Sequence, residues 1–206
     1  MLIKSNPNHI IMNTKTIGEE MWKAEEKVPA DMFHCLYGAI MAEYWRFHDG
    51  NDNGADTTNA ANTRLDKIGH QMGCRLVEGV CAKAPPSVSV FLASPTTGFV
   101  QAGEVLVKLL FKQLMNASVQ VSAVDNFKVI VTLPNDLTRN VQLPDNARNH
   151  LSYLSIWCGI LRGAMEMLNW RVKVTVVSDM LLGDSKNELE MTLLDRLHDA
   201  KPRLED

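Results

Sequence analysis

Residues 151–168 read LSYLSIWCGILRGAMEML. Apolar side chains recur along this stretch at steps of three and four, the spacing of one helix face: Leu151, Leu154, Cys158, Leu161, Met165 and Leu168. More apolar residues fall on the remaining faces, and the only charges are Arg162 and Glu166, four residues apart and able to pair. The pattern predicts a helix at the centre of the fold, with a packing role and not a catalytic one.

Glycines interrupt this helix at an interval of one turn. Gly159 and Gly163 lie within it, and an earlier helix carries Gly69 and Gly73 at the same spacing. Each glycine costs about 1 kcal/mol relative to a good helix former. The spacing therefore indicates that two helices approach closely, either within the chain or across a subunit interface. Simple tolerance of glycine carries equal weight as an explanation.

The composition is that of a single soluble globular domain. The chain has 206 residues, 46% hydrophobic and 22% charged. The net charge of −3 and the pI near 6.1 argue against a nucleic-acid surface. The start of the chain is polar and mixed in charge, which argues against a signal peptide, and no cysteine belongs to a CxxC pair, so we expect reduced, cytosolic thiols. Prolines break the longest charge-free stretch, Ala84–Gly103, so no segment is predicted to span a bilayer as a helix.

The periodicities predict an α+β fold. About four main helices are expected to pack on a four-stranded antiparallel sheet, made of two hairpins on either side of the central helix. The other helices are expected over residues 30–48, 62–83 and 101–115, and the strands over 119–123, 127–133, 172–176 and 189–197. Polar residues 49–63 and apolar residues 84–99 are expected to form loops. Residues 1–28 lack a clean period and are expected to form a flexible extension, followed by one domain over 29–200 and an acidic tail over 201–206.

Motifs of common catalytic and metal sites are missing. The sequence has neither a phosphate-binding G-x-x-x-x-G-K-[ST] loop nor a G-x-S-x-G elbow. None of the six histidines pairs with other ligands at metal-site spacing. His34 and Cys35 are adjacent, but neighbouring residues on a helix point about 100° apart, so we do not expect them to cooperate. No catalytic or metal site is predicted.

Two sequence blocks resemble a known family. Residues 65–78 read LDKIGHQMGCRLVE, and LPDN at 143–146 is followed by CGILRGAMEM at 158–167. The first block is similar to the second-helix signature of the small core subunits of TRAPP, the transport protein particle. The second block resembles the branch of that family known as subunit three. Phe33, Leu36 and Tyr37 of the first helix also fit, and the likeness covers roughly residues 29–200.

The resemblance implies a scaffold role and no enzyme activity of the chain alone. Family members form homodimers or heterodimers through helical faces and build a vesicle-tethering complex. That complex promotes nucleotide exchange on a Rab-type GTPase in transport from the endoplasmic reticulum to the Golgi, at the cytosolic side of cis-Golgi and endoplasmic reticulum membranes. Residues implied in packing or interfaces are Gly69, Gly73, Arg75, Gly159, Arg162 and Gly163. The tail residues Arg203, Glu205 and Asp206 match the part of the family that reaches toward the GTPase.

The resemblance also implies one ligand, a palmitate-like fatty acyl chain held in a hydrophobic channel. In the family it is thioester-linked to a cysteine after the second helix, whereas the matching position here is Ser89 or Thr96, depending on the direction of counting. Cys81 is the nearest thiol, so either the link is lost or Cys81 replaces it. A chain could still bind without a bond, because each buried methylene contributes about 0.8 kcal/mol. A free lipid-binding homodimer is therefore the alternative function.

Overall fold

The computed structural model describes residues 13–49, 54–139, 141–143, 145–148 and 150–197. The helices are α1 (Thr14–Ala24), α2 (Ala30–Asp49), α3 (Gly54–Lys83), α4 (Pro86–Ala93), α5 (Phe99–Met115), α6 (Asp145–Arg148) and α7 (Ser155–Glu166). The strands are β1 (Gln120–Asp125), β2 (Lys128–Leu133), β3 (Trp170–Ser178) and β4 (Asn187–Arg196). Short 3-10 turns follow β2 and β3. The α+β prediction is confirmed.

The centre of the fold is the contact between α3 and α7. Ten of the twelve residues of α7 are buried, as its apolar sequence predicts. A Cβ atom built on Gly73 would lie within 3.0 Å of the Ile160 carbonyl oxygen, and one built on Gly163 within 3.0 Å of the carbonyl oxygen of His70. Gly69 and Gly159 meet the opposite backbone in the same way. The two glycine pairs therefore face each other within one chain, and any side chain there would separate the helices.

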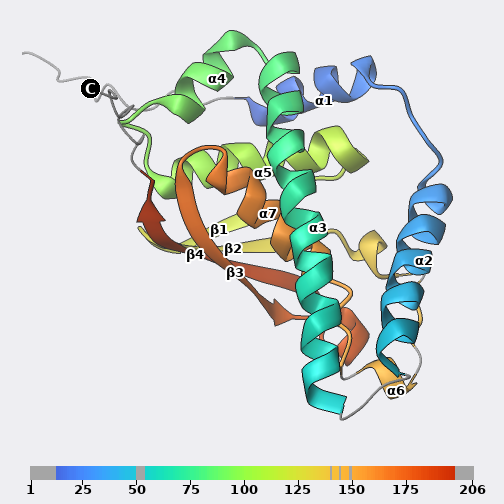
Figure 1. Ribbon diagram of the computed structural model, residues 1–206. Helices are drawn as coiled ribbons and strands as arrows, with labels where there is room; N and C mark the ends of the chain where they lie inside the picture. The colour runs from blue at the N-terminus through green and yellow to red at the C-terminus, as the bar shows by residue number, and fades with distance from the viewer. Residues whose placement is uncertain (1–12, 50–53, 140, 144, 149, 198–206) are drawn as a thin grey trace, which may run out of the picture.

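The sheet joins two hairpins in the order β1-β2-β4-β3, with every neighbouring pair antiparallel. Val131 pairs with Leu189 and Val129 with Met191, and all four side chains are buried on the inner face. Helices α5 and α7 cover this face, where the rings of Phe111 and Trp157 stack with centroids 5.3 Å apart. Helix α1 packs on α5, while α3 and α2 lie outside α7, away from the sheet (Figure 1).

Several elements differ from the sequence prediction. The stretch before residue 28 holds α1, whose first turn is capped by the Asn13 side chain accepting from the Thr16 N–H (3.2 Å) and whose Met21 is buried. The predicted loop over 84–99 contains α4, because proline is tolerated in the first turn of a helix. Helix α3 begins at Gly54, inside the predicted polar loop.

The central helix is also shorter than predicted, and its charges pair differently. Helix α7 ends at Glu166 and begins at Ser155. The predicted pair of Arg162 with Glu166 is wrong: Arg162 binds Asp66, and Glu166 lies 2.6 Å from His70 Nε2. Both partners belong to α3, and tight helix packing places them nearer than the neighbouring turn of α7.

We predict that Gly73→Ala destabilises the chain, because the new methyl group would push against the α7 backbone. The loss should be about 1–3 kcal/mol or more in urea unfolding. Gly38→Ala in α2 is the matched control, since a Cβ at Gly38 meets no atom within 4 Å. That substitution should leave stability unchanged or raise it by about 0.5–1 kcal/mol. Equal unfolding free energies for both variants would contradict the packing described here.

Candidate functional site

Helix α2 exposes an apolar stripe on the side turned away from the core. We call Met32, Cys35, Leu36 and Ala39 the α2 outer face; they share one side of the helix and all are exposed. Met32 is 61% and Leu36 60% accessible. The opposite side of α2 packs on the protein through Tyr37, which is only 2% exposed. Exposed apolar residues gathered on one side of a helix are typical of an interaction surface.

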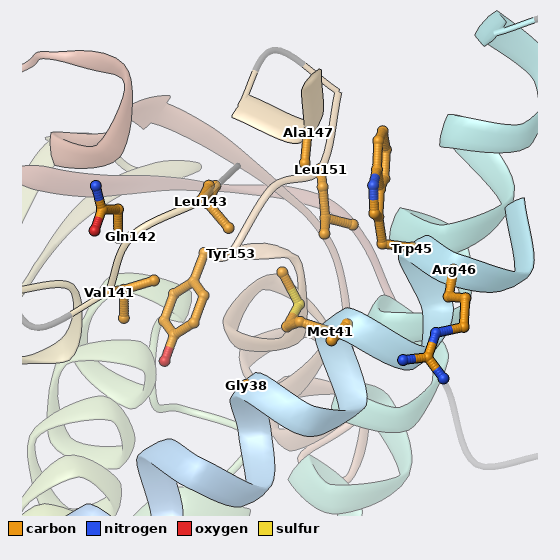
Figure 2. Close-up of a pocket in the computed structure, with 11 residues that line it drawn as sticks. Gly38, Met41, Trp45, Arg46, Val141, Gln142, Leu143, Ala147, Leu151 and Tyr153 are labelled. Atoms are coloured by element: carbon orange, nitrogen blue, oxygen red, sulfur yellow. The ribbon is translucent and has the colours of Figure 1, made fainter. Parts of the chain in front are cut away.

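A groove of about 700 Å³ lies beside this stripe, between α2 and residues 141–153 (Figure 2). Its lining is mostly apolar, with Met41 and Trp45 from α2 and Val141, Leu143, Leu151 and Tyr153 from the facing segment. Arg46 and Gln142 supply polar groups, and both are exposed. The volume and the few polar groups are typical of a site that binds a ligand or a partner side chain.

Hydrogen bonds hold the far wall of the groove to α2 and α3. Tyr37 of α2 donates its hydroxyl to the Tyr153 carbonyl oxygen, and the two rings lie 4.5 Å apart. Asn62 of α3 donates to the His150 carbonyl oxygen (2.9 Å) and accepts from the Ser152 N–H (2.9 Å). These bonds fix the turn between α6 and α7, which otherwise has no regular structure.

Tyr153 lines the groove, but its hydroxyl oxygen is buried. Tyr153 as a whole is 2% exposed, and its hydroxyl oxygen has no hydrogen-bond partner among the described residues. Figure 2 shows this hydroxyl directed away from Ala147 and Leu151. Burial raises the pKa of Tyr153 to about 12, so the group is a neutral donor at physiological pH. A buried donor without an acceptor is costly, so we expect this hydroxyl to lower the stability of the free chain.

The residues proposed for acylation lie elsewhere. Cys81 is half-buried in the last turn of α3, where its carbonyl oxygen accepts from the Ser89 hydroxyl (3.2 Å). Thr96 is exposed in the turn after α4. Cys81 follows Asn62 by nineteen residues, which corresponds to about 28 Å along the helix. None of these three side chains lines the groove.

Of the other three cysteines, two are thiols with raised pKa values and one is exposed. Burial, with a smaller contribution from Asp66, raises the pKa of Cys158 to about 12. Burial and the Glu166 carboxylate also raise the pKa of Cys74, whose sulfur lies 3.6 Å from the Gly163 carbonyl oxygen. Both are therefore thiols and not thiolates at neutral pH. Cys35 is exposed on the α2 outer face.

The remaining site residues predicted from sequence do not gather at the groove. Arg162 binds Asp66 across the contact of α3 with α7, and Arg75 is exposed on α3. Arg203, Glu205 and Asp206 fall outside the described residues. Within the described ranges, no group of three or more histidine, cysteine or carboxylate side chains could hold a metal ion. No helix among the described residues has the length and apolarity needed to cross a bilayer.

Sequence reasoning missed the groove because its walls come from distant segments. Tyr153 precedes α7, and the periodicity over 151–168 assigns it to the central helix. The only local signal is a tyrosine in a run that otherwise reads as core, shortly after the LPDN block at 143–146.

Known proteins resemble the chain over most of its length. The model of the family described as transport protein particle (TRAPP) component matches residues 33–192. The chain is 35% identical over 186 residues to transport protein particle subunit bet3 of Schizosaccharomyces pombe, covering 88% of this chain and 93% of that protein. It is 33% identical over 198 residues to trafficking protein particle complex subunit BET3 of Saccharomyces cerevisiae, covering 93% and 95%.

A solved structure shows a similar fold. It is the crystal structure of trafficking protein particle complex subunit 3 from Naegleria fowleri covalently bound to palmitic acid. The sequence identity is 28% and the TM-score 0.70, with 84% of this chain and 100% of the Naegleria chain covered. The arrangement of helices on an antiparallel sheet is thus shared.

We predict opposite effects from removing the two tyrosine hydroxyls. Tyr37→Phe deletes a donor and leaves the Tyr153 carbonyl oxygen buried without its partner, so stability should fall by about 1–3 kcal/mol. Tyr153→Phe removes a hydroxyl that has no partner, so stability should stay equal or rise slightly. Urea unfolding of both variants measures the difference. A Tyr153→Phe loss as large as that of Tyr37→Phe would show that the hydroxyl is already bonded in the free chain.

Proposed function

Because the chain belongs to the TRAPP component family, we propose that it is a core subunit of a multisubunit vesicle-tethering complex. The complex would promote nucleotide exchange on a Rab-type GTPase in transport from the endoplasmic reticulum to the Golgi. In this role the chain is a scaffold and supplies no catalytic group of its own. The observation that carries the proposal is the exposed apolar outer face of α2.

The outer face has the properties of a subunit contact. Complete burial of side chains such as Met32 and Leu36 contributes about 1.5–3 kcal/mol each. Helix α2 runs along the margin of the molecule beside α3 (Figure 1), so a helix of a second subunit has room to lie against it. Gly38 and Ala39 have no side chain or only a methyl group, so a partner helix could approach the backbone of α2 closely here. The partner would be a small subunit of the same family or a second copy.

We assign the groove to the same contact. It borders α2, and its mostly apolar lining would receive an apolar side chain of the partner. Exposed Arg46 adds a positive charge at the groove. A partner side chain with an apolar body and an acceptor at its end fits this combination.

The same proposal gives the location of the complex in the cell and a role for the C-terminal residues of the chain. The complex would sit at the cytosolic side of cis-Golgi and endoplasmic reticulum membranes as a peripheral assembly. The C-terminal residues, Arg203, Glu205 and Asp206 among them, would face the GTPase. Removal of residues 198–206 should then lower exchange activity of the assembled complex without lowering subunit binding.

We predict that Leu36→Glu abolishes subunit assembly while the free chain stays folded. A charge buried in an apolar contact is strongly unfavourable, so affinity should fall by about a hundredfold or more, whereas an exposed substitution changes stability by about 0.5 kcal/mol or less. Val124→Glu is the matched control, because Val124 on β1 is 59% exposed. Affinity purification of each tagged chain from its own cells, with mass spectrometry of the bound proteins, makes the comparison.

The outcomes separate the hypotheses. Recovery of other small family subunits with the wild type and with Val124→Glu, but not with Leu36→Glu, supports the proposal. Equal recovery with Leu36→Glu would exclude the α2 outer face as the contact. Recovery of the wild-type chain with only its own copies would favour a free homodimer.

A fatty acyl carrier is the second candidate function, supported by the apolar groove and by the palmitic acid bound to the Naegleria relative. We propose that the chain holds a palmitate-like acyl chain without a thioester, because Ser89 and Thr96 occupy the matching positions.

Intact mass spectrometry and organic extraction of the protein from its own cells test this candidate. We expect an extractable fatty acid and an unmodified intact mass. A hydroxylamine-sensitive mass increase that disappears in Cys81→Ser would instead place a thioester at Cys81. Absence of any acyl chain in both measurements would remove the second candidate.

A further inference from the structure

A small basic hollow lies where the start of α1 meets the end of α5. Its volume is about 190 Å³, and three lysines line it: Lys15 of α1 and Lys108 and Lys112 of α5. Thr14 and Ser118 also line it and add hydroxyl groups. We propose that this hollow binds a phosphate group, carried by a lipid headgroup or by a soluble phosphate ester. The proposal is independent of the subunit contact at α2.

The central cation is held in place and only weakly neutralised. The side chain of Lys112 is just 13% exposed, and its carboxylate partner Glu19 is 3.9 Å away. A Cβ atom on Gly18 would lie within 3.0 Å of the Lys112 stem, so the glycine of α1 makes room for this lysine. A lysine whose ion pair is this long can gain from a closer anion.

The charge balance around the hollow is positive. Lys108 pairs with Glu104, 2.5 Å away on the next turn of α5, and Lys112 with Glu19. No described carboxylate lies within 4.0 Å of the Lys15 ammonium. Three ammonium groups against two carboxylates leave a net charge of about +1 where the hollow opens.

The start of α1 adds backbone donors to these cations. The Asn13 side chain takes the N–H of Thr16, while the N–H groups of Thr14 and Lys15 have no acceptor within the helix. The first turn of α1 has no acidic residue to oppose an anion. Helix N-termini carry a partial positive charge, and lysine is a common phosphate ligand. The wall therefore offers ammonium, hydroxyl and N–H donors at one concave place, which suits a doubly charged oxyanion.

Calorimetric titration of the full chain with inorganic phosphate, at constant ionic strength, tests the pocket. We expect saturable binding by the wild type and a loss of about tenfold or more in affinity for the double variant Lys15→Gln, Lys108→Gln. Both substituted side chains reach the surface, so the variant should stay folded; Lys112 is left unchanged because its stem is packed. Lys173→Gln is the control, since Lys173 is exposed on β3. No saturable binding by the wild type, or an equal loss with Lys173→Gln, would overturn the proposal.

Flotation with phosphatidylcholine vesicles identifies the source of the phosphate. If vesicles containing phosphatidylinositol 4-phosphate carry the wild type but not the double variant, the ligand is a lipid headgroup. If inorganic phosphate binds but the vesicles do not, it is a soluble phosphate ester. Vesicle binding that persists in the double variant, with no phosphate binding in solution, would rule out the pocket. Subunit assembly of the double variant should be unchanged, so failure here leaves the tethering proposal untouched.

Discussion

The backbones of α3 and α7 are in direct contact, and the rest of the molecule depends on that contact. Gly69 and Gly73 on one helix face Gly159 and Gly163 on the other, each where a methyl group would meet a carbonyl oxygen. Because α7 also packs on β3 and stacks its Trp157 on Phe111 of α5, the contact sets the distance between the sheet and the outer helices. Helix α3 in turn carries Asn62, which holds the wall of the groove. The position of the candidate site therefore depends on the close contact between α3 and α7.

The parts of the fold that sequence predicted are those with a strong local period. The apolar circumference of α7, the paired glycines and the alternating strands each depend on neighbours within a few turns, and all are present in the structure. Helices α1 and α4 were missed because each is short, and the apolar residues of α4 also show little helical periodicity. The groove and the partner of Arg162 were missed for a different reason: they join residues about ninety positions apart, which no local pattern records.

The groove and the thiol nearest to the predicted acylation position lie at opposite ends of α3. The groove and the α2 outer face adjoin the first half of the helix, whereas Cys81 and Ser89 are near its last turn. About 28 Å of rigid helix lies between Asn62 and Cys81. A chain attached at Cys81 would enter the protein far from the subunit contact. A thioester at Cys81, if one forms, and assembly at the α2 outer face could thus be altered independently by substitution.

The bonds around Tyr153 also determine when the groove is completed. The Tyr37 hydroxyl bonds to a residue 116 positions later in the sequence, Tyr153. Asn62 bonds to His150, 88 positions later. Each of these bonds can form only after residues 150–153 have been synthesised. Helix α2 makes few contacts with the rest of the protein, so we expect it to be among the first elements to open in the native state. During synthesis a nascent chain would expose this helix longest, so the surface proposed for partners is also the one at which a chaperone or a second nascent subunit would engage first.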